Sequence, residues 1–253
     1  MQAASNSRDK SGNSDAPRFL AAGDTALVVQ FGEDVDREIN RKVIALAAAL
    51  REREIAGIVD LVPTFRSLMI HYDPLVVGGA DLRDLVSASL DGLAASEVKG
   101  RLWRVPVLYG GEAGPDLSEV AERCGLTEEK VVELHGSVTY EVYMMGFLPG
   151  LGYLGILPKE LELPRRSDPR VRVPARSVAI AINQTNVYPM ESPGGWHLLG
   201  RTPVELFDRG LDDPILLAAG DRIEFSSIDQ DGSDALRRRI DAGEYHLSPE
   251  EAE

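Results

Sequence analysis

The sequence has one cysteine, no long apolar segment and few positive charges, and each shortage excludes a class of protein. Cys124 alone can form no internal disulfide. No apolar run approaches the roughly 18 residues that a membrane span requires, and the N-terminal residues lack the hydrophobic core of a signal peptide. Because 27 Lys and Arg face 41 Asp and Glu, a net charge of −14, the surface repels nucleic acid. We therefore expect a cytoplasmic protein with no membrane or nucleic-acid partner.

Residues that bind metals are also scarce. The four histidines are scattered and show no ligand spacing with Cys or carboxylates, so we expect no bound metal; they are His71, His135, His197 and His246. Cys124 shares one helical stripe with apolar neighbours. We interpret it as a small buried hydrophobic residue and not as a reactive thiol.

The first part of the chain predicts a two-layer α+β domain. Residues 1–16, rich in polar and small residues, should be disordered. Residues 17–98 give hairpin, helix, hairpin and helix signals in that order, which predicts an antiparallel sheet of four strands with two helices. Asp81 should open the second helix. The first helix is the strongest of these predictions, because its apolar positions share one face: Val35, Ile39, Val43, Leu46 and Leu50.

Residues 99–228 predict a second domain of mainly β character, joined to the first by a linker at 98–102. A strand and two short helices, at 116–124 and 128–135, precede strands separated by Pro- and Gly-rich loops. This pattern favours a barrel over an open sheet. The acidic segment 229–253 should be a solvated helix or tail.

A basic run interrupts this acidic chain. The sequence RRSDPRVRVPAR, from Arg165 to Arg176, holds five arginines and one aspartate. The planar guanidinium suits carboxylates and phosphates, so the run can form an anion pocket. The alternative is that each arginine lies on a solvated face and pairs with one of the surplus acids.

Two further segments combine glycine and proline with aromatic residues. MMGFLPGLGYLGILP, at 144–158, either lets a ligand approach backbone amides or is a tight crossover of the barrel. SPGGWHLLGRTP, at 192–203, reads poorly as helix or strand and offers amides, a Trp196 wall and the Arg201 cation. With the neutral polar residues just upstream, these are the parts of a pocket for a small, partly planar molecule. The alternatives are that Trp196 is core and Arg201 caps a loop. His135 has an alternative too, because its place at a helix C-terminus is favoured by the helix dipole alone.

Taken in order, these segments resemble a known family. GDTALVVQFG, GIVDLVPTFRSLMIHYDP, YEVYMMGFLPGLGYLG, YPMESPGGWHLLGRTP and LLAAGDRIEF look like the allophanate hydrolase subunit 1 family, which includes the B subunit of 5-oxoprolinase and the sporulation-kinase inhibitor KipI. The likeness covers residues 18–228 and extends to the carboxyltransferase region of urea carboxylases. It implies an N-terminal α+β domain and a cyclophilin-like β-barrel domain.

The resemblance also implies an activity. The 5-oxoprolinase members, as assemblies, open a cyclic amide with ATP and Mg, converting 5-oxoproline to glutamate. The chain would then be one subunit of a hydrolase, inactive alone, since it shows no nucleotide motif and no nucleophile paired with a base. The implied partner is a second barrel-fold subunit, the C subunit of 5-oxoprolinase, also called allophanate hydrolase subunit 2. Two alternatives stay open: a KipI-like inhibitor of a histidine kinase, and a urea-carboxylase-like carboxyltransferase component.

Matching motif positions implies the residues of the site. The catalytic candidates are His135, Gln184 and Arg201. The substrate-binding candidates are Tyr140, Phe147, Pro149, Arg172, Pro174, Thr185, Tyr188, Ser192, Gly194, Gly195 and Trp196. Because anion binding needs guanidinium groups that converge on one ligand, we expect Arg172 and Arg201 to line one cleft together with Gln184 and Trp196.

The chain departs from the family pattern VPAGSVGIAGxQTGIYP at four glycines. Arg176, Ala179, Ile182 and Asn186 occupy these positions, and PGLGYLG replaces PGFPYLG. Asparagine tolerates a left-handed backbone, whereas a β-branched isoleucine scarcely does. Where these glycines serve ligand approach, the pocket of this chain is narrower.

Overall fold

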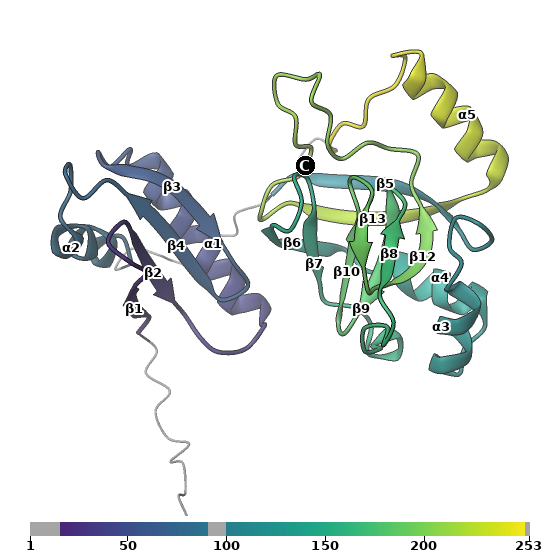
Figure 1. Cartoon of the computed structure of the whole chain (residues 1–253), viewed down its shortest axis with the longest axis horizontal. Helices are drawn as coiled ribbons and strands as arrows, with labels where there is room; N and C mark the ends of the chain where they lie inside the picture. The colour runs from purple at the N-terminus through teal and green to yellow at the C-terminus, as the bar shows by residue number, and fades with distance from the viewer. Residues whose placement is uncertain (1–15, 91–99, 251–253) are drawn as a thin grey trace, which may run out of the picture. The chain divides into compact units, whose positions relative to one another are not determined.

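The computed structural model describes residues 16–90 and 100–250, and the chain divides into two compact units, Met1–Ser96 and Glu97–Glu253 (Figure 1). Residues 1–15 of the expected N-terminal tail and residues 98–99 of the expected linker lie outside the described residues. Both expectations therefore stay predictions.

The N-terminal unit is a four-stranded antiparallel sheet with two helices. Its elements are β1 (Arg18–Ala21), β2 (Ala26–Gln30), α1 (Arg37–Glu52), β3 (Ile58–Pro63), β4 (Ser67–Tyr72) and α2 (Gly79–Leu90). The strands lie in the order β1-β2-β4-β3, and every neighbouring pair is antiparallel. The predicted order of hairpin, helix, hairpin and helix is confirmed.

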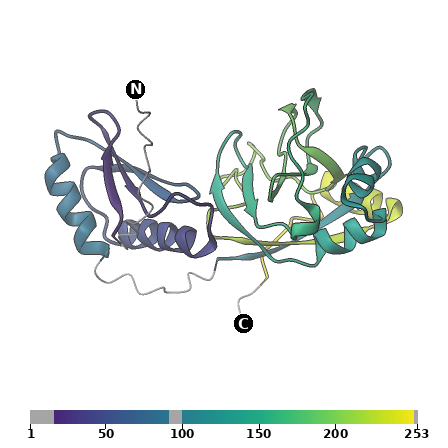
Figure 2. The same cartoon turned by 90° about the horizontal axis from the view of Figure 1, so that it is seen from below.

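One apolar face of this sheet packs against both helices. Alternate strand residues such as Val29, Leu68 and Ile70 are buried in one core with Leu46 of α1 and Leu82 of α2. Figure 2 shows α1 along one face of the sheet. The unit is therefore two-layered, with both helices on the same face.

The N-terminal ends of the two helices differ slightly from the prediction. The Asp36 carboxylate accepts hydrogen bonds from the backbone N–H groups of Glu38 and Ile39, at 2.8 and 3.0 Å, and so caps α1. Val35 precedes this cap and is 39% exposed, so its assignment to the buried helix face was wrong. α2 begins at Gly79, which places Asp81 in its first turn.

The C-terminal unit is a closed barrel. Its strands are β5 (Leu102–Tyr109), β6 (Tyr140–Met145), β7 (Gly152–Gly155), β9 (Ser177–Ala181), β10 (Gln184–Val187), β12 (His197–Arg201) and β13 (Arg222–Ile228). They follow the order β10-β7-β6-β13-β5-β12-β9, and the barrel closes where β9 pairs with β10. β8 (Arg170–Val173) and β11 (Ser192–Gly194) form a separate antiparallel pair, the β8–β11 ribbon. The predicted barrel is confirmed.

The segment 192–203 was expected to be neither helix nor strand, and this was wrong. It contributes β11 and then β12, which pairs with both β5 and β9. Leu198 and Leu199 are both buried, because β12 is covered on both faces. A strand covered on both faces lacks the alternation of apolar and polar residues by which strands are recognised.

The β8–β11 ribbon covers part of the outer surface of the barrel. Along β9, Val178 and Ile180 belong to the core inside the barrel. Ala179 and Ala181 point outward and pack in a second, smaller core with Val173 of β8. The outer face of β9 is therefore buried under the ribbon.

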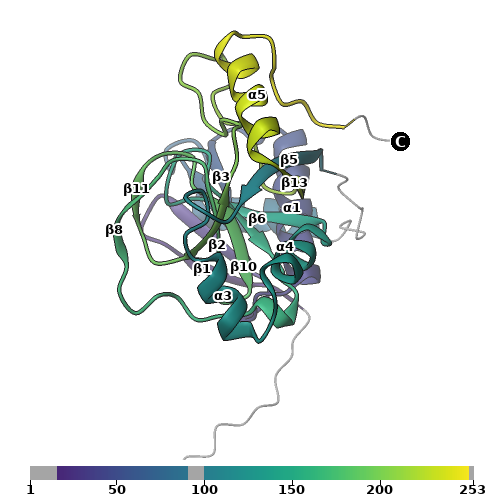
Figure 3. The ribbon, with the colours of Figure 1, turned by 90° about the vertical axis from the view of Figure 1, so that its right-hand side faces the viewer.

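Helices flank this barrel at several places. They are α3 (Leu117–Cys124), α4 (Glu128–Gly136), the 3-10 turn η1 (Lys159–Leu161) and α5 (Gln230–Asp241). Figure 3 shows α5 and the α3–α4 pair on different sides of the barrel. The two predicted short helices are confirmed. Cys124, at the end of α3, is half-buried against the barrel core, and this burial raises the pKa of its thiol.

The C-terminal segment is only in part the solvated helix that we expected. α5 has no buried residue, so it lies on the surface. The chain after it returns to the barrel, where Leu247 packs against the core. The Glu250 backbone N–H then donates to the Leu102 carbonyl at 2.8 Å. This last stretch is held against β5.

Candidate functional site

The structure distributes the fourteen predicted site residues over three places in the C-terminal unit. His135, Tyr140 and Thr185 lie inside the barrel core. Arg201 lines a cavity between the barrel and α5. The others lie on the outer face of the barrel, on the β8–β11 ribbon and the turns beside it, or in the loop between β6 and β7.

Inside the barrel, His135 and Thr185 belong to one chain of hydrogen bonds. His135 Nδ1 lies 2.7 Å from the Tyr109 hydroxyl, and Nε2 lies 2.9 Å from Thr185 Oγ1. Thr185 donates its own hydroxyl proton to the Ala179 carbonyl at 3.1 Å. It therefore accepts from the Nε2–H of His135, which leaves Nδ1 to accept from Tyr109.

Burial keeps this histidine neutral. His135 is fully buried, its ring stacks on Phe225 at 4.7 Å, and burial lowers its pKa to about 3. Tyr140 is also fully buried and donates to the His135 carbonyl at 2.9 Å. The alternative interpretation was that the helix dipole favours a histidine at this helix C-terminus. The dipole favours the charged form of histidine, so it does not explain the neutral His135. The geometry gives these residues a role in holding α4, β5 and β10 together, and both ring nitrogens of His135 already have protein partners.

On the outer face of β10, Gln184 and Asn186 form a buried polar pair. They are two residues apart and so share a strand face, opposite Ala181 and Ala179 of β9. Gln184 Nε2 and Asn186 Oδ1 are buried without a hydrogen-bond partner. An unpaired buried polar group costs about 1–3 kcal/mol. One donor and one acceptor on one face would both be satisfied by a ligand that carries an amide group.

Aromatic rings and a glycine surround this polar pair. Trp196 and Tyr188 are buried in the outer core, and Tyr153 meets Trp196 edge-on at 6.1 Å. A Cβ at Gly194 would lie 2.4 Å from the Tyr188 hydroxyl oxygen, so only glycine fits the ribbon at this point. Burial raises the pKa of Tyr188 to about 12, so its phenol is a neutral donor at physiological pH. Trp196 is part of the outer core, as the alternative interpretation proposed. Its ring also borders the polar pair, as the predicted wall of a site requires.

A cation lies beside these rings. The Arg165 guanidinium lies 5.9 Å from the centre of the Trp196 ring. Its charge also acts on Tyr153 and Tyr188. Arg165 is exposed and makes no ion pair among the described residues. Arg165 is therefore the arginine of the basic run that is available to bind an anion at this face.

The remaining predicted residues differ in exposure. Phe147 and Pro149 are exposed in the loop after β6, and Phe147 has a φ of 67°. Pro174 and Gly195 are half-buried. Ser192 is buried, and its hydroxyl donates to the adjacent Pro193 carbonyl.

Most arginines of the basic run pair with acids, as the alternative interpretation proposed. Asp116 is buried and accepts from Arg170 at 2.6 and 2.8 Å and from Arg166 at 3.2 Å. The same carboxylate also accepts from the backbone N–H of Leu198 at 2.7 Å. Arg172 is 77% exposed and lies 2.8 Å from Glu191.

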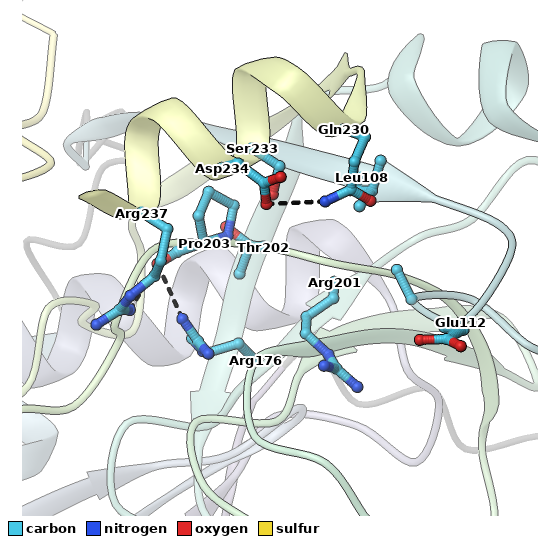
Figure 4. Close-up of a pocket in the computed structure, with 11 residues that line it drawn as sticks. Leu108, Glu112, Arg176, Arg201, Thr202, Pro203, Gln230, Ser233, Asp234 and Arg237 are labelled. Atoms are coloured by element: carbon cyan, nitrogen blue, oxygen red, sulfur yellow. Dashed lines mark hydrogen bonds between the residues drawn. The ribbon is translucent and has the colours of Figure 1, made fainter. Parts of the chain in front are cut away.

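Arg201 lies in a different part of the barrel, in a cavity of about 260 Å³. Arg176 and Arg237 line the same cavity, and α5 contributes Gln230 and Ser233 (Figure 4). The Nε of Arg201 is buried and has no hydrogen-bond partner.

The expected cleft shared by Arg172, Arg201, Gln184 and Trp196 was wrong. Arg201 pairs with Ser177 at the start of β9, whereas Gln184 pairs with Ala181 at its end. Four residues of extended strand separate these points, roughly 13 Å. Sequence spacing could not show this, because strand register decides which ends meet.

Two of the four positions that depart from the family glycines have a glycine-like backbone. Arg176 and Ile182 have φ values of 67° and 60°. Ala179 and Asn186 lie in strands and face each other in the β9–β10 pair. The last two therefore place a methyl group and an amide on the outer face.

Sequence reasoning missed Arg165 and Asn186 as members of the site. The alternation in QTNV places Gln184 and Asn186 on one strand face, and this signal was available. Nothing in the sequence separated Arg165 from the other four arginines of the run.

The described residues contain neither a metal-binding cluster nor a membrane-spanning helix. Within residues 16–90 and 100–250 no group of three or more His, Cys, Asp or Glu side chains could hold a metal ion. In the same residues, none of the helices has the length and apolar character needed to cross a membrane.

The comparison with known families places the chain in a carboxyltransferase-domain family. The family described as carboxyltransferase domain, subdomain C and D, matches residues 17–217, and the chain belongs to this family. The structure resembles urea amidolyase of K. lactis with a TM-score of 0.75 at 19% identity, over 97% of this chain and 17% of that chain.

Nearer relatives share more of the sequence. The B subunit of 5-oxoprolinase from Bacillus subtilis (strain 168) is 39% identical over 241 residues, 91% of this chain and 95% of that protein. The corresponding protein of Escherichia coli O157:H7 is 40% identical over 82% of this chain and 94% of its own length. The crystal structure of TTHA0988 has a TM-score of 0.73 and 41% identity over 81% of this chain, which spans only 40% of that protein.

Proposed function

We propose that this protein is one subunit of a 5-oxoprolinase, which opens the cyclic amide of 5-oxoproline to give glutamate. The observation that carries the proposal is the identity of 39% to the B subunit of a 5-oxoprolinase over 95% of the length of that relative. Such a match extends over both units of this chain and not over one motif.

The outer face of β10 supports this substrate chemically. A cyclic amide has one N–H donor and one carbonyl acceptor, which Asn186 Oδ1 and Gln184 Nε2 would satisfy. The flat ring would lie against Trp196, and the carboxylate would meet Arg165.

The chain needs a partner for this reaction. Hydrolysis coupled to ATP requires a site for the nucleotide and Mg, and the sequence has no phosphate-binding loop motif. We assign this role, wholly or in part, to a second barrel-fold subunit, corresponding to the C subunit of 5-oxoprolinase, in a cytoplasmic complex. A stable complex would bury on the order of 1,600 Å² in total.

Activity of the separate and combined subunits tests the proposal. Glutamate formation from 5-oxoproline, ATP and Mg should be absent with the purified chain and present when the partner subunit is added. Robust turnover by the chain alone would refute the need for a partner. A combined preparation that forms no glutamate but suppresses autophosphorylation of a histidine kinase would favour the inhibitor alternative.

Two substitutions locate the substrate. Arg165→Met should raise KM for 5-oxoproline roughly tenfold or more, because a charge-assisted pair contributes about 1.5–3 kcal/mol. Gln184→Leu should lower kcat/KM by a similar factor. Arg238→Met, which removes an exposed arginine of α5, is the matched control and should leave both constants unchanged.

A further inference from the structure

The cavity beside α5 brings together three arginines from separate parts of the chain. Arg176 precedes β9, Arg201 ends β12, and Arg237 lies on α5. Figure 4 shows the side chains of Arg176 and Arg201 extending below α5. Arg176 and Arg237 both donate to the Pro203 carbonyl, at 3.2 and 3.1 Å, so their guanidinium groups are direct neighbours.

The acids that pair with these arginines are shared unevenly among them. Glu205 serves two of the guanidinium groups, at 2.7 Å from Arg237 and 3.7 Å from Arg176. Asp241 pairs with Arg237. Arg201 has no ion pair among the described residues, and its buried Nε lacks any hydrogen-bond partner.

The electrostatics of Arg176 reflect its burial and the charges of both signs around it. Burial has the largest effect and lowers the pKa of Arg176. Glu205 and Asp241 raise this pKa, and repulsion from Arg237 and Arg201 lowers it. An anion placed between the guanidinium groups would relieve this repulsion.

Among the other lining residues, Ser233 suits an oxyanion, whereas Asp234 and Glu112 are acids. Ser233 offers a hydroxyl donor from the first turn of α5, the end where the helix dipole is positive. Of the two acids in the lining, Asp234 accepts from Gln230 at 2.8 Å, and Glu112 is exposed to solvent.

We propose that this cavity is a binding site for the phosphate group of a small molecule, held by Arg176, Arg201 and Arg237. Guanidinium forks bind oxyanions in a bidentate way, and a phosphate dianion matches several forks better than a single carboxylate does. At about 260 Å³, the cavity is below the roughly 300–1,000 Å³ that drug-sized ligands occupy, so it suits inorganic phosphate or a small phosphorylated metabolite and not a whole nucleotide.

This site is independent of the proposed substrate face. Arg201 pairs in register with Ser177, at the opposite end of β9 from Gln184 and Ala181. Arg237 lies beyond residue 217, where the family match ends. The site therefore combines a family motif with a helix from outside the matched region.

Isothermal titration calorimetry of the purified full chain with inorganic phosphate tests the site. Wild type and Arg238→Met, a control on the same helix, should bind phosphate with equal affinity. Arg201→Met should weaken the binding at least tenfold, and Arg201→Lys, which keeps the charge but loses the fork, should also weaken it. Circular dichroism shows whether each variant is folded. If Arg201→Met does not fold, Arg201→Lys decides the test.

Three results would overturn the proposal. These are an absence of saturable phosphate binding by wild type, equal binding by wild type and both Arg201 variants, and acetate binding as tight as phosphate binding at matched ionic strength. The assay contains neither 5-oxoproline nor a partner subunit, so its outcome is separate from that of the proposed function.

Discussion

Backbone strain at Ile182 and Arg176 gives a quantitative prediction. Both residues have φ near 60°, a conformation that costs a non-glycine residue about 1–2 kcal/mol. We compare glycine with alanine at each position, since both remove the side chain beyond Cβ. Glycine also loses about 0.5–1 kcal/mol more chain entropy on folding. At Ile182 and Arg176, the glycine variant should therefore be more stable than the alanine variant by about 0.5–1 kcal/mol.

The two strand positions are the internal control. Asn186 and Ala179 lie in β10 and β9 and have no positive φ, so glycine has no strain to relieve there. At Asn186, the glycine variant should be less stable than the alanine variant by about 0.5–1 kcal/mol. Ala179→Gly should likewise be less stable than the wild type.

Tryptophan fluorescence measures these differences in stability specifically for the C-terminal unit. The two tryptophans, Trp103 and Trp196, are both buried in the C-terminal unit, so their emission follows the unfolding of the barrel. A difference of 0.5–1 kcal/mol corresponds to roughly 1–4 °C in Tm for a chain of this size. Alanine variants that are more stable than glycine variants at both Ile182 and Arg176 would refute the argument.

Two further predictions concern buried charge. The pKa of His135 is about 3 in the folded state and roughly 6.5 in the unfolded chain. As the pH falls, the unfolded state therefore takes up a proton before the folded state does. The free energy of unfolding should fall by about 1.4 kcal/mol per pH unit as the pH drops from 6.5 towards 3. Urea unfolding at several pH values should show a shallower slope for His135→Gln, and an unchanged slope would contradict this. Asp116→Asn should cost about 3 kcal/mol, the lower end of the cost of breaking a buried ion pair, because Asp116 is buried while the Arg170 side chain is 25% exposed. Arg172→Ala, at an exposed pair with Glu191, should cost about 1 kcal/mol or less. Equal losses of Tm in these two variants would show that burial does not set the difference.

Local patterns predicted much of the fold. The helix α1 follows from apolar residues at helical spacing, and the strand β9 from a run of small and β-branched residues. β12 was missed because it follows Gly194 and Gly195, contains Gly200 and is buried on both faces, which removes the alternation. The contacts of the segment after α5 with β5 were missed because they join residues far apart in sequence.

The candidate site was harder to predict than the fold. Motif positions placed Gln184 and Trp196 on one face, and the structure brings them there. The same positions could not separate an arginine that is free, such as Arg165, from one that is paired, such as Arg170, since the partner Asp116 lies more than fifty residues away in sequence. His135 had the residue type of a catalytic base, but its burial depends on how the barrel closes around it.

The pairing of β13 with β5 constrains the order in which this chain can fold during synthesis. β13 lies between β5 and β6, and it is the last strand of the barrel to be made. Until Arg222–Ile228 leaves the ribosome, β5 and β6 present open edges that can pair wrongly. The core of the N-terminal unit, in contrast, is complete once Leu90 has emerged. A nascent chain stalled before Arg222 should thus carry a folded first unit and an open, aggregation-prone second one.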